Sequence, residues 1–352
     1  MYRTRFLLHA TLTVIYLVII AGAVVRMTGS GMGCPDWPKC FGYYIPPTEA
    51  DALEWKPEHV YKKGQVIIKE EKLEVAQRDF TSTAMYNPLN WEVYTKHDYA
   101  LFNPWHTWIE YINRLLGALA GLFTLALFIS TLIDYKKSKK HIVIAGFVLF
   151  GILFQAWLGA TVVYSELNPL KITLHMLMAL VLVALLFYLK SQIDSEQLET
   201  TELKPHRPLL IAALMLTLLQ VLFGTQVRQS VDHFIDNGNP IANWIQNAPV
   251  LFYVHRSFSI IVLIINGMLY YRLKKTSPLN FTYYQVVLGL ILIEVGTGIA
   301  MTYFEFPFSS QPLHLVIASL LFGVQAYLVM KTSGRLAPSN SKNLCCIKFE
   351  SS

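Results

Sequence analysis

Eight long apolar stretches run through this 352-residue chain, and they restrict its fold more than any other feature. A helix needs roughly 20 apolar residues to cross the hydrocarbon core of a bilayer. Only 15% of the residues are charged, whereas a soluble domain carries about a quarter. The sequence therefore predicts an all-α polytopic membrane protein with eight transmembrane helices, at residues 6–27, 107–133, 142–163, 172–190, 208–228, 252–271, 281–303 and 312–330.

The distribution of Lys and Arg predicts the orientation in the membrane. If there are eight spans, most of the basic residues outside them fall on one side, which the positive-inside rule makes cytoplasmic. They are Arg3, Arg5, Lys136, Lys137, Lys139, Lys140, Arg272, Lys274, Lys275, Lys331 and Arg335. We expect both termini to be cytoplasmic, and this bias explains the net charge of +6 without nucleic acid. Neither a secretory cleavage site nor an Arg- and Ser-rich leader is visible, so a bacterial plasma membrane is expected.

The first four spans resemble the last four. Gly22 precedes Arg26 by four residues, as Gly224 precedes Arg228. The segment 155–159 aligns with 294–298 at the same offset that separates His175 from His314. An even number of spans in each half makes the copies parallel. We expect two pseudo-symmetric four-helix bundles, with these limits: residues 1–190, including an outer loop at 28–104; a cytoplasmic linker at 191–207; residues 208–335; and a cytoplasmic tail at 336–352.

Four side chains that are costly at membrane depth lie near the outer starts of every second span. They are Asn113, His175, His255 and His314. His255 and His314 can face each other across the second bundle, and two imidazoles between apolar helices suit a six-coordinate haem. Zinc would usually need three or four ligands. The sequence thus predicts a haem iron bound by His255 and His314.

Four arginines lie at the outer ends of spans, against the positive-inside bias: Arg26, Arg114, Arg228 and Arg256. Two haems would present four propionates, and Arg–carboxylate pairs are strong and directional. The alternative is that these side chains reach lipid headgroups. We therefore assign the four arginines to cofactor binding as a hypothesis.

Glu110 occurs in only one half, because Phe252 stands at the corresponding place in the other. A carboxylate beside a haem can move protons or stabilise a developing cation, and its alternative is an ion pair with Arg114. His106 shares a helix face with Glu110 and Asn113. It is a ligand, a proton carrier or an interfacial residue, and the sequence does not separate these.

Two cysteines, Cys34 and Cys40, follow the first span. The outer side is oxidising, so a disulfide is expected there, with a structural or a redox role. Cys345 and Cys346 fall in the cytoplasmic tail, where free thiols are expected.

Together these residues resemble the haem A synthase family. The resemblance covers all eight spans and is most specific at residues 22–40, with Glu110-Tyr-Ile-Asn-Arg114 and the three histidines in support. It implies oxidation of a ring methyl of haem O to a formyl group. It also implies haem b on His255 and His314, a substrate haem on His175 in the first bundle, Glu110 as the essential carboxylate, and Cys34 with Cys40 as the family's cysteine pair.

Asn113 departs from the family's pattern, which has His there. An amide is a poor ligand for haem iron, so we expect a five-coordinate substrate haem on His175. The alternative is that His106 supplies the second ligand, although two helical turns, roughly 10 Å, would shift the haem. The role of the loop 43–100 is not predicted.

A competing function is a di-haem electron carrier that modifies neither haem. The single Glu110 and the missing ligand at Asn113 argue against it, because a carrier would have both haems coordinatively saturated. Candidate partners are haem O, haem A, membrane lipid, haem O synthase and cytochrome oxidase assembly factors. A homo-oligomer is left open.

Overall fold

Eight helices in the described residues are long and apolar enough to cross a membrane. The computed structural model describes residues 2–134, 138–193, 203–276, 278–304, 306–307 and 309–332, without the side chains of 236 and 278–280. The predicted spans are confirmed. The helices are α1 (Tyr2–Met27), α2 (Pro104–Ile133), α3 (Lys139–Tyr164), α4 (Pro169–Ile193), α6 (Arg207–Asp236), α7 (Val250–Thr276), α8 (Pro278–Tyr303) and α9 (Ser310–Lys331).

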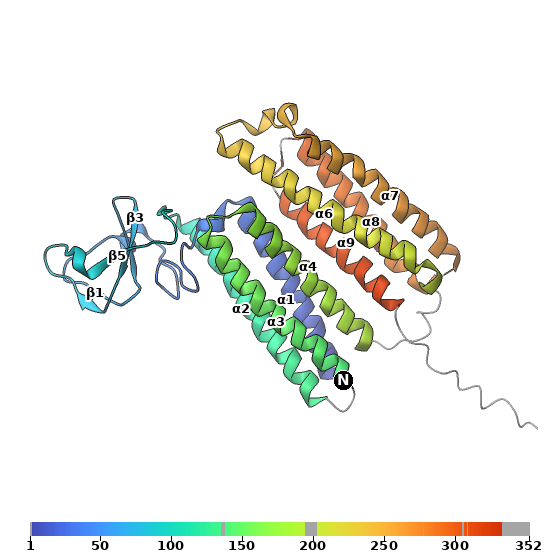
Figure 1. Ribbon diagram of the computed structural model, residues 1–352, viewed down its shortest axis with the longest axis horizontal. Helices are drawn as coiled ribbons and strands as arrows, with labels where there is room; N and C mark the ends of the chain where they lie inside the picture. Colours follow the sequence, from blue (N-terminus) through green and yellow to red (C-terminus); the bar gives the residue numbers. More distant parts are fainter. Residues whose placement is uncertain are drawn as a thin grey trace, which may run out of the picture.

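The helices form two groups, α1–α4 and α6–α9, each packed around its own apolar core (Figure 1). Leu127, Val148 and Leu186 are fully buried in the first core, and Leu269 and Val287 in the second. The groups meet where α9 of the second packs against α4 and α1 of the first. The two-bundle pseudo-symmetry and the domain limits stay predictions, but the grouping of helices agrees with them.

One end of both groups carries all the candidate site residues and is called the cap end here. At this end α2 begins on Asn103, whose side chain accepts hydrogen bonds from the backbone N–H groups of Trp105 and His106, and Pro104 occupies the first helical position. Both features favour a helix start. The outer loop therefore ends where the second span was expected to begin.

Helix α6 is longer at the cap end than its apolar stretch suggested. The predicted span ended at residue 228, but the helix continues for two more turns to Asp236. Hydropathy detects only the apolar part of a helix. Beyond it Arg228 pairs with Asp232 one turn later, at 2.7 Å, which is a favourable helical spacing. Residues 229–236, which the predicted spans leave outside the membrane helices, are therefore helical.

The loop between α1 and α2 folds into a small β-containing cap, which the sequence did not predict. Strands β1 (Val60–Tyr61) and β4 (Phe80–Thr81) pair antiparallel. Strands β2 (Val66–Lys69), β3 (Lys72–Ala76) and β5 (Trp91–Val93) form a second antiparallel sheet in the order β2-β3-β5. Short 3-10 helices lie at η1 (Ser30–Met32), η2 (Ala50–Leu53), η3 (Pro88–Asn90), η4 (Lys204–His206), η5 (Ile241–Asn243) and η6 (Ile245–Asn247).

Two small apolar clusters hold the cap together. Phe41 and Leu53 pack with β2 and β3 in one, and Ile67 and Trp91 lie in the other. Strands of two to five residues leave too short an alternating pattern to be recognised in the sequence. The cap extends away from the helices beyond α1 and α2 (Figure 1).

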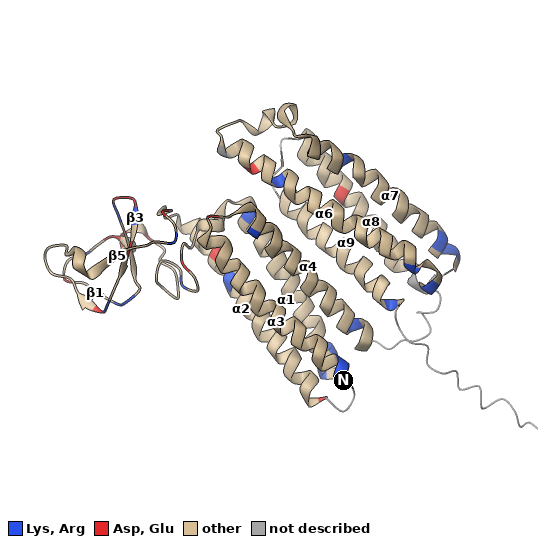
Figure 2. Cartoon of the chain, viewed as in Figure 1, with Lys and Arg blue, Asp and Glu red and all other residues tan. Residues whose placement is uncertain are grey.

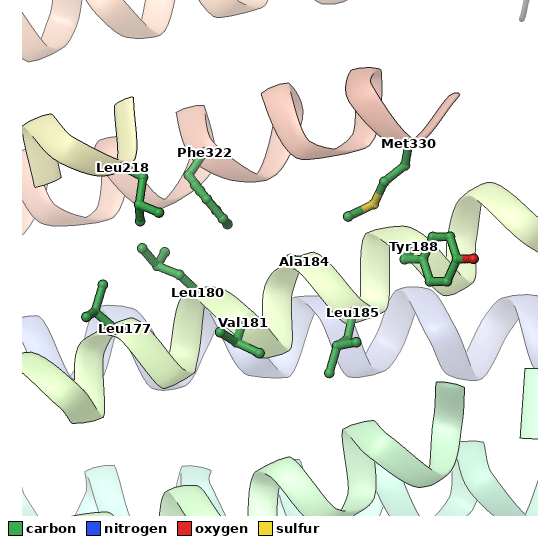
Figure 3. Close-up of a pocket in the computed structure, with 9 residues that line it drawn as sticks. All are labelled: Leu177, Leu180, Val181, Ala184, Leu185, Tyr188, Leu218, Phe322 and Met330. Atoms are coloured by element: carbon green, nitrogen blue, oxygen red, sulfur yellow. The ribbon is translucent and has the colours of Figure 1, made fainter. Parts of the chain in front are cut away.

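An apolar cavity of about 450 Å³ lies between the two groups of helices. Its walls include Leu180 and Ala184 of α4, Leu218 of α6 and Phe322 of α9 (Figure 3). Ala184 follows His175 by two and a half helical turns, so the cavity lies on the face of α4 opposite to that histidine. The cavity is therefore separate from the site described below.

Charged residues are sparse along the helices and gather toward their ends (Figure 2). This agrees with a multi-pass membrane protein, and the orientation with cytoplasmic termini stays a prediction. Some basic residues used to predict the orientation, and the two cysteines of the predicted tail, lie outside the described residues. They are Lys136, Lys137, Arg335, Cys345 and Cys346.

Candidate functional site

The predicted pair of histidines does come together in the second group of helices. His255 near the start of α7 and His314 near the start of α9 have ring centroids 6.4 Å apart, with the ring planes inclined at 72°. Imidazole nitrogens bind first-row metals at about 2.0 Å, so two rings on opposite sides of one metal have centroids roughly 6 Å apart. The spacing suits one iron between the two rings.

Glycines on the neighbouring helices make room for both imidazoles. A side-chain carbon at Gly224 of α6 would lie 3.2 Å from Cε1 of His255, and one at Gly298 of α8 would lie 3.9 Å from Cε1 of His314. A larger residue at Gly224 would press directly on the ring of His255. Nδ1 of His255 is buried and has no hydrogen-bond partner among the described residues.

A carboxylate that the sequence reasoning left without a role contacts one of these histidines. Glu294 of α8 places Oε2 at 2.9 Å from Nδ1 of His314, and Thr297 Oγ1 lies 2.8 Å from the same nitrogen. The segment 294–298 was recognised as part of the repeat, but only for its alignment. An ionisable residue within a span is costly, and this signal could have identified Glu294 as a candidate site residue.

The first group of helices repeats this arrangement around His175 and Asn113. A side-chain carbon at Gly159 of α3 would lie 3.3 Å from Cε1 of His175, and one at Gly22 of α1 would lie 3.9 Å from Oδ1 of Asn113. Nδ1 of His175 and Oδ1 of Asn113 are both buried, without hydrogen-bond partners in the described part of the chain. Asn113 thus stands where His255 stands in the other half.

Glu110 lies on α2 one turn closer to the cap than Asn113, and both of its carboxylate oxygens accept hydrogen bonds. Its Oε1 accepts from Arg114, at 2.5 Å from NH2 and 3.1 Å from Nε. Its Oε2 accepts from the backbone N–H of Cys34 at 2.7 Å. The carboxyl side chain is only 5% exposed. The ion pair with Arg114, which the sequence left as an alternative, is therefore present, and whether Glu110 acts in catalysis stays a prediction.

Arg114 also binds the loop that contains Cys34 and Cys40, called the cysteine loop here, to α2. Its NH2 donates to the carbonyl of Cys34 at 2.7 Å, and its NH1 donates to the carbonyls of Asp36 and Lys39 at 2.6 and 2.9 Å. Thr107 Oγ1 donates to the carbonyl of Gly33 at 2.8 Å. The guanidinium that was predicted to bind a propionate is thus bonded to protein groups in this structure.

Cys34 and Cys40 form the predicted disulfide within this loop. Between them, Asp36 accepts from the backbone N–H groups of Phe41 and Gly42 at 2.5 and 2.8 Å. Burial raises the pKa of the Asp36 carboxyl, although these two bonds and Arg114 act in the opposite direction. The loop is therefore a compact lid whose backbone touches Glu110.

The remaining predicted arginines differ in their surroundings. Arg26 of α1 and Arg228 of α6 both pair with Asp232, at 2.8 and 2.7 Å, and the sequence reasoning had overlooked this carboxylate. Nε of Arg26 is buried without a partner among the described residues, so this guanidinium retains a donor for an anionic group. Arg256 is exposed, 5.5 Å from the ring of Tyr253, which suits the lipid-facing alternative.

His106 lies in the first turn of α2, partly exposed. Its imidazole makes no hydrogen bond to any residue that the structure describes. The interfacial alternative agrees with this position, and a role as ligand or proton carrier stays untested.

The comparisons with known proteins agree with this geometry. A family model described as COX15-CtaA, cytochrome oxidase assembly protein, matches residues 5–86 and 53–326. Three similar proteins, each named heme A synthase, cover nearly the whole chain. That of Shewanella oneidensis is 24% identical over 90% of this chain and 92% of its own length; that of Ehrlichia canis is 25% identical over 90% and 89%; and that of Rickettsia canadensis is 26% identical over 94% and 98%.

Proposed function

This chain belongs to the COX15-CtaA family of cytochrome oxidase assembly proteins, and we propose that it is a haem A synthase, a membrane oxidoreductase that converts haem O to haem A. The reaction oxidises one ring methyl of haem O to a formyl group and passes the electrons to an acceptor. The similar proteins named heme A synthase support this proposal, because each aligns with both groups of helices.

The observation that carries the proposal is the difference between the two sites. Both have a glycine facing each candidate ligand. The second has two facing imidazoles and no carboxylate at the place of Glu110, where Phe252 stands. The first has one imidazole, an amide and a buried Glu110. One site thus suits a saturated resident cofactor, and the other suits a substrate.

The second site would hold haem b. His255 and His314 would bind its iron, and the glycines at 224 and 298 leave space for the imidazoles. When bound, a bis-imidazole haem supplies one-electron transfer. The protein's contribution is to hold both rings at the observed spacing and to surround them with apolar helices.

The first site would bind haem O as substrate through His175. The buried Nδ1 of His175 and the space at Gly159 favour a ring that is positioned by packing. Because Asn113 offers only an amide, His175 would be the one protein ligand of the substrate iron at this site. Arg26 is available for a propionate, since its buried Nε retains a donor.

Glu110 is the group that we assign to proton transfer or to stabilisation of positive charge on the reacting carbon. Its two oxygens are fixed by Arg114 and by the N–H of Cys34, so its position is set before substrate binds. A prepositioned carboxylate contributes through geometry and charge, as general acid–base groups do. The disulfide loop closes this site toward the cap.

The test is haem extraction and mass analysis from cells that make haem O, with and without this chain. We expect haem A only when the chain is present, and loss of haem A in Glu110→Gln. Gln has nearly the same size but a single acceptor oxygen, so it can keep the bond from Arg114 or the bond from Cys34 but not both, and it removes the charge. Glu54→Gln, a change at an exposed carboxylate of the cap, is the matched control and should leave haem A formation intact.

The low-spin spectrum of haem b serves as the check on folding and should persist in Glu110→Gln. Normal haem A formation by that variant would contradict the catalytic role of Glu110. If the wild-type chain carries haem b and leaves haem O unmodified, the di-haem electron carrier becomes the better proposal. Cytoplasmic termini, and contacts with haem O synthase and assembly factors, stay predictions.

A further inference from the structure

Glu294 occupies a position that no other residue of the repeat matches chemically. It lies four residues before Gly298, the glycine that faces His314. The corresponding residues before the other three glycines are Val18, Gln155 and Gln220. Gln155 and Gln220 each donate to a backbone carbonyl, that of His175 and that of His255, both at 2.9 Å. Glu294 instead contacts the imidazole itself.

The hydrogen bonds around His314 determine which ring nitrogen carries the proton. Thr297 Oγ1 lies 3.0 Å from the carbonyls of Ile293 and of Glu294 in its own helix, so its single proton is donated there. Toward Nδ1 of His314 it can then only accept. The carboxylate of Glu294 is also an acceptor. When Glu294 is ionised, Nδ1 therefore carries the proton, and Nε2 is the nitrogen with a free lone pair.

This contact is confined to one of the two predicted ligands. Among the described residues, Nδ1 of His255 has no hydrogen-bond partner. Glu294 and His314 are both largely enclosed, with side chains 15% and 25% exposed. In such surroundings a bond to a charged acceptor is stronger than one to a neutral acceptor. The two imidazoles are thus not equivalent.

We propose that Glu294 is a positioning residue for haem b: its carboxylate holds Nδ1–H of His314, directs Nε2 toward the iron, and lowers the reduction potential of the haem. The inference rests on the proposed function, which places haem b between His255 and His314. A carboxylate behind a ligating imidazole fixes the ring and makes it a stronger electron donor. A stronger donor and a nearby negative charge both favour the ferric state, and hydrogen bonding of this kind tunes haem potentials.

The test is the midpoint potential of haem b in the purified full-length protein, measured by redox titration, together with the ferric low-spin EPR signal. In Glu294→Gln the amide oxygen can still accept from Nδ1–H, but the charge is lost. We expect haem b to be retained, with a more positive midpoint potential and a changed EPR signal. Glu294→Leu removes the acceptor, and we expect less haem per protein after purification.

The matched control is Gln155→Leu, the same position in the other half of the chain. This variant removes a contact to a histidine backbone and should leave the haem b potential unchanged. A wild-type potential in Glu294→Gln would overturn the inference, and so would an equal shift in Gln155→Leu. Absence of a bis-imidazole signal from the wild type, or its survival in His314→Ala, would instead contradict the proposed ligand pair.

Discussion

At the scale of single residues, Arg114 shows how one side chain connects a membrane helix to the cap. It bonds Glu110 on its own helix and three backbone carbonyls of the cysteine loop. Its planar guanidinium offers five donors in a rigid fork, whereas lysine offers a single mobile ammonium. The residue type, and not only the charge, is therefore needed at this position.

We expect Arg114→Lys to loosen the cysteine loop. Lysine keeps the charge but leaves several carbonyls and part of Glu110 without their donors, and each buried acceptor left without a donor costs about 1–3 kcal/mol. Thermal unfolding in detergent should show a lower midpoint, and limited proteolysis should cut faster within residues 28–104. Arg256→Lys, at an exposed arginine, is the control. Equal unfolding midpoints and proteolysis rates for the two variants would contradict the role of Arg114 in holding the cysteine loop.

The Glu110–Arg114 pair could be foreseen, because residues four apart on a helix are neighbours. The bond from the backbone of Cys34 to Glu110 could not, since it joins residues 76 apart in the chain. Sequence spacing determines which side chains share a helix face. It does not determine which loop will lie against that face.

At the scale of elements, the site depends on close approach between neighbouring helices. Each candidate ligand, Asn113 included, faces a glycine on the adjacent helix of its own group. The lack of a side chain there leaves space for an imidazole between helices that otherwise pack tightly. This explains why the Gly positions recur along with the histidines in the repeat.

We expect Gly224→Leu to abolish haem b binding, because the new side chain would occupy the place of the His255 ring, 3.2 Å from the first added carbon. The readout is the low-spin haem spectrum per mole of purified protein. Gly289→Leu on α8 is the control, since nothing lies within 4 Å of an added carbon there. Retention of full haem content by Gly224→Leu would show that the ring can move away.

Hydropathy predicted all eight spans because a long apolar helix is a local property of the sequence. It failed at the end of α6, where helix continues through Arg228 and Asp232. The fold of the cap was not predicted either, because its strands are stabilised by pairing between segments such as β3 and β5. The pairing of short strands is decided by their partners.

At the scale of the whole molecule, polar contacts join the two groups of helices at the cap end. Arg26 of the first group and Arg228 of the second share the carboxylate of Asp232. Gln229 of α6 donates to Thr173 of α4 at 2.9 Å. Farther from the cap end the contact between the groups includes the apolar cavity in Figure 3. The two candidate sites thus keep a defined relation through residues near their outer ends.

We expect Asp232→Asn to weaken the association between the two groups. The three side chains are 22–36% exposed, so solvent screens the pair and the loss is on the order of 1 kcal/mol. Thermal unfolding in detergent at low and high salt measures it, and the wild type should lose its advantage at high salt. Asp51→Asn, which breaks the exposed pair with Lys56 in the cap, is the control. Equal, salt-independent unfolding midpoints for wild type and Asp232→Asn would show that the ion pairs of Asp232 do not stabilise the association of the two groups.

The sequence by itself determined the eight spans, the positions of the four candidate ligands and the cysteine pair, because hydropathy and the internal repeat are read along the chain. Only the tertiary structure decided which charged side chains meet across different helices and loops. Glu294 reaches His314, Asp232 reaches Arg26, and Glu110 reaches the cysteine loop. These contacts depend on which helices become neighbours and on their relative heights, and both are set by packing between elements distant in the sequence.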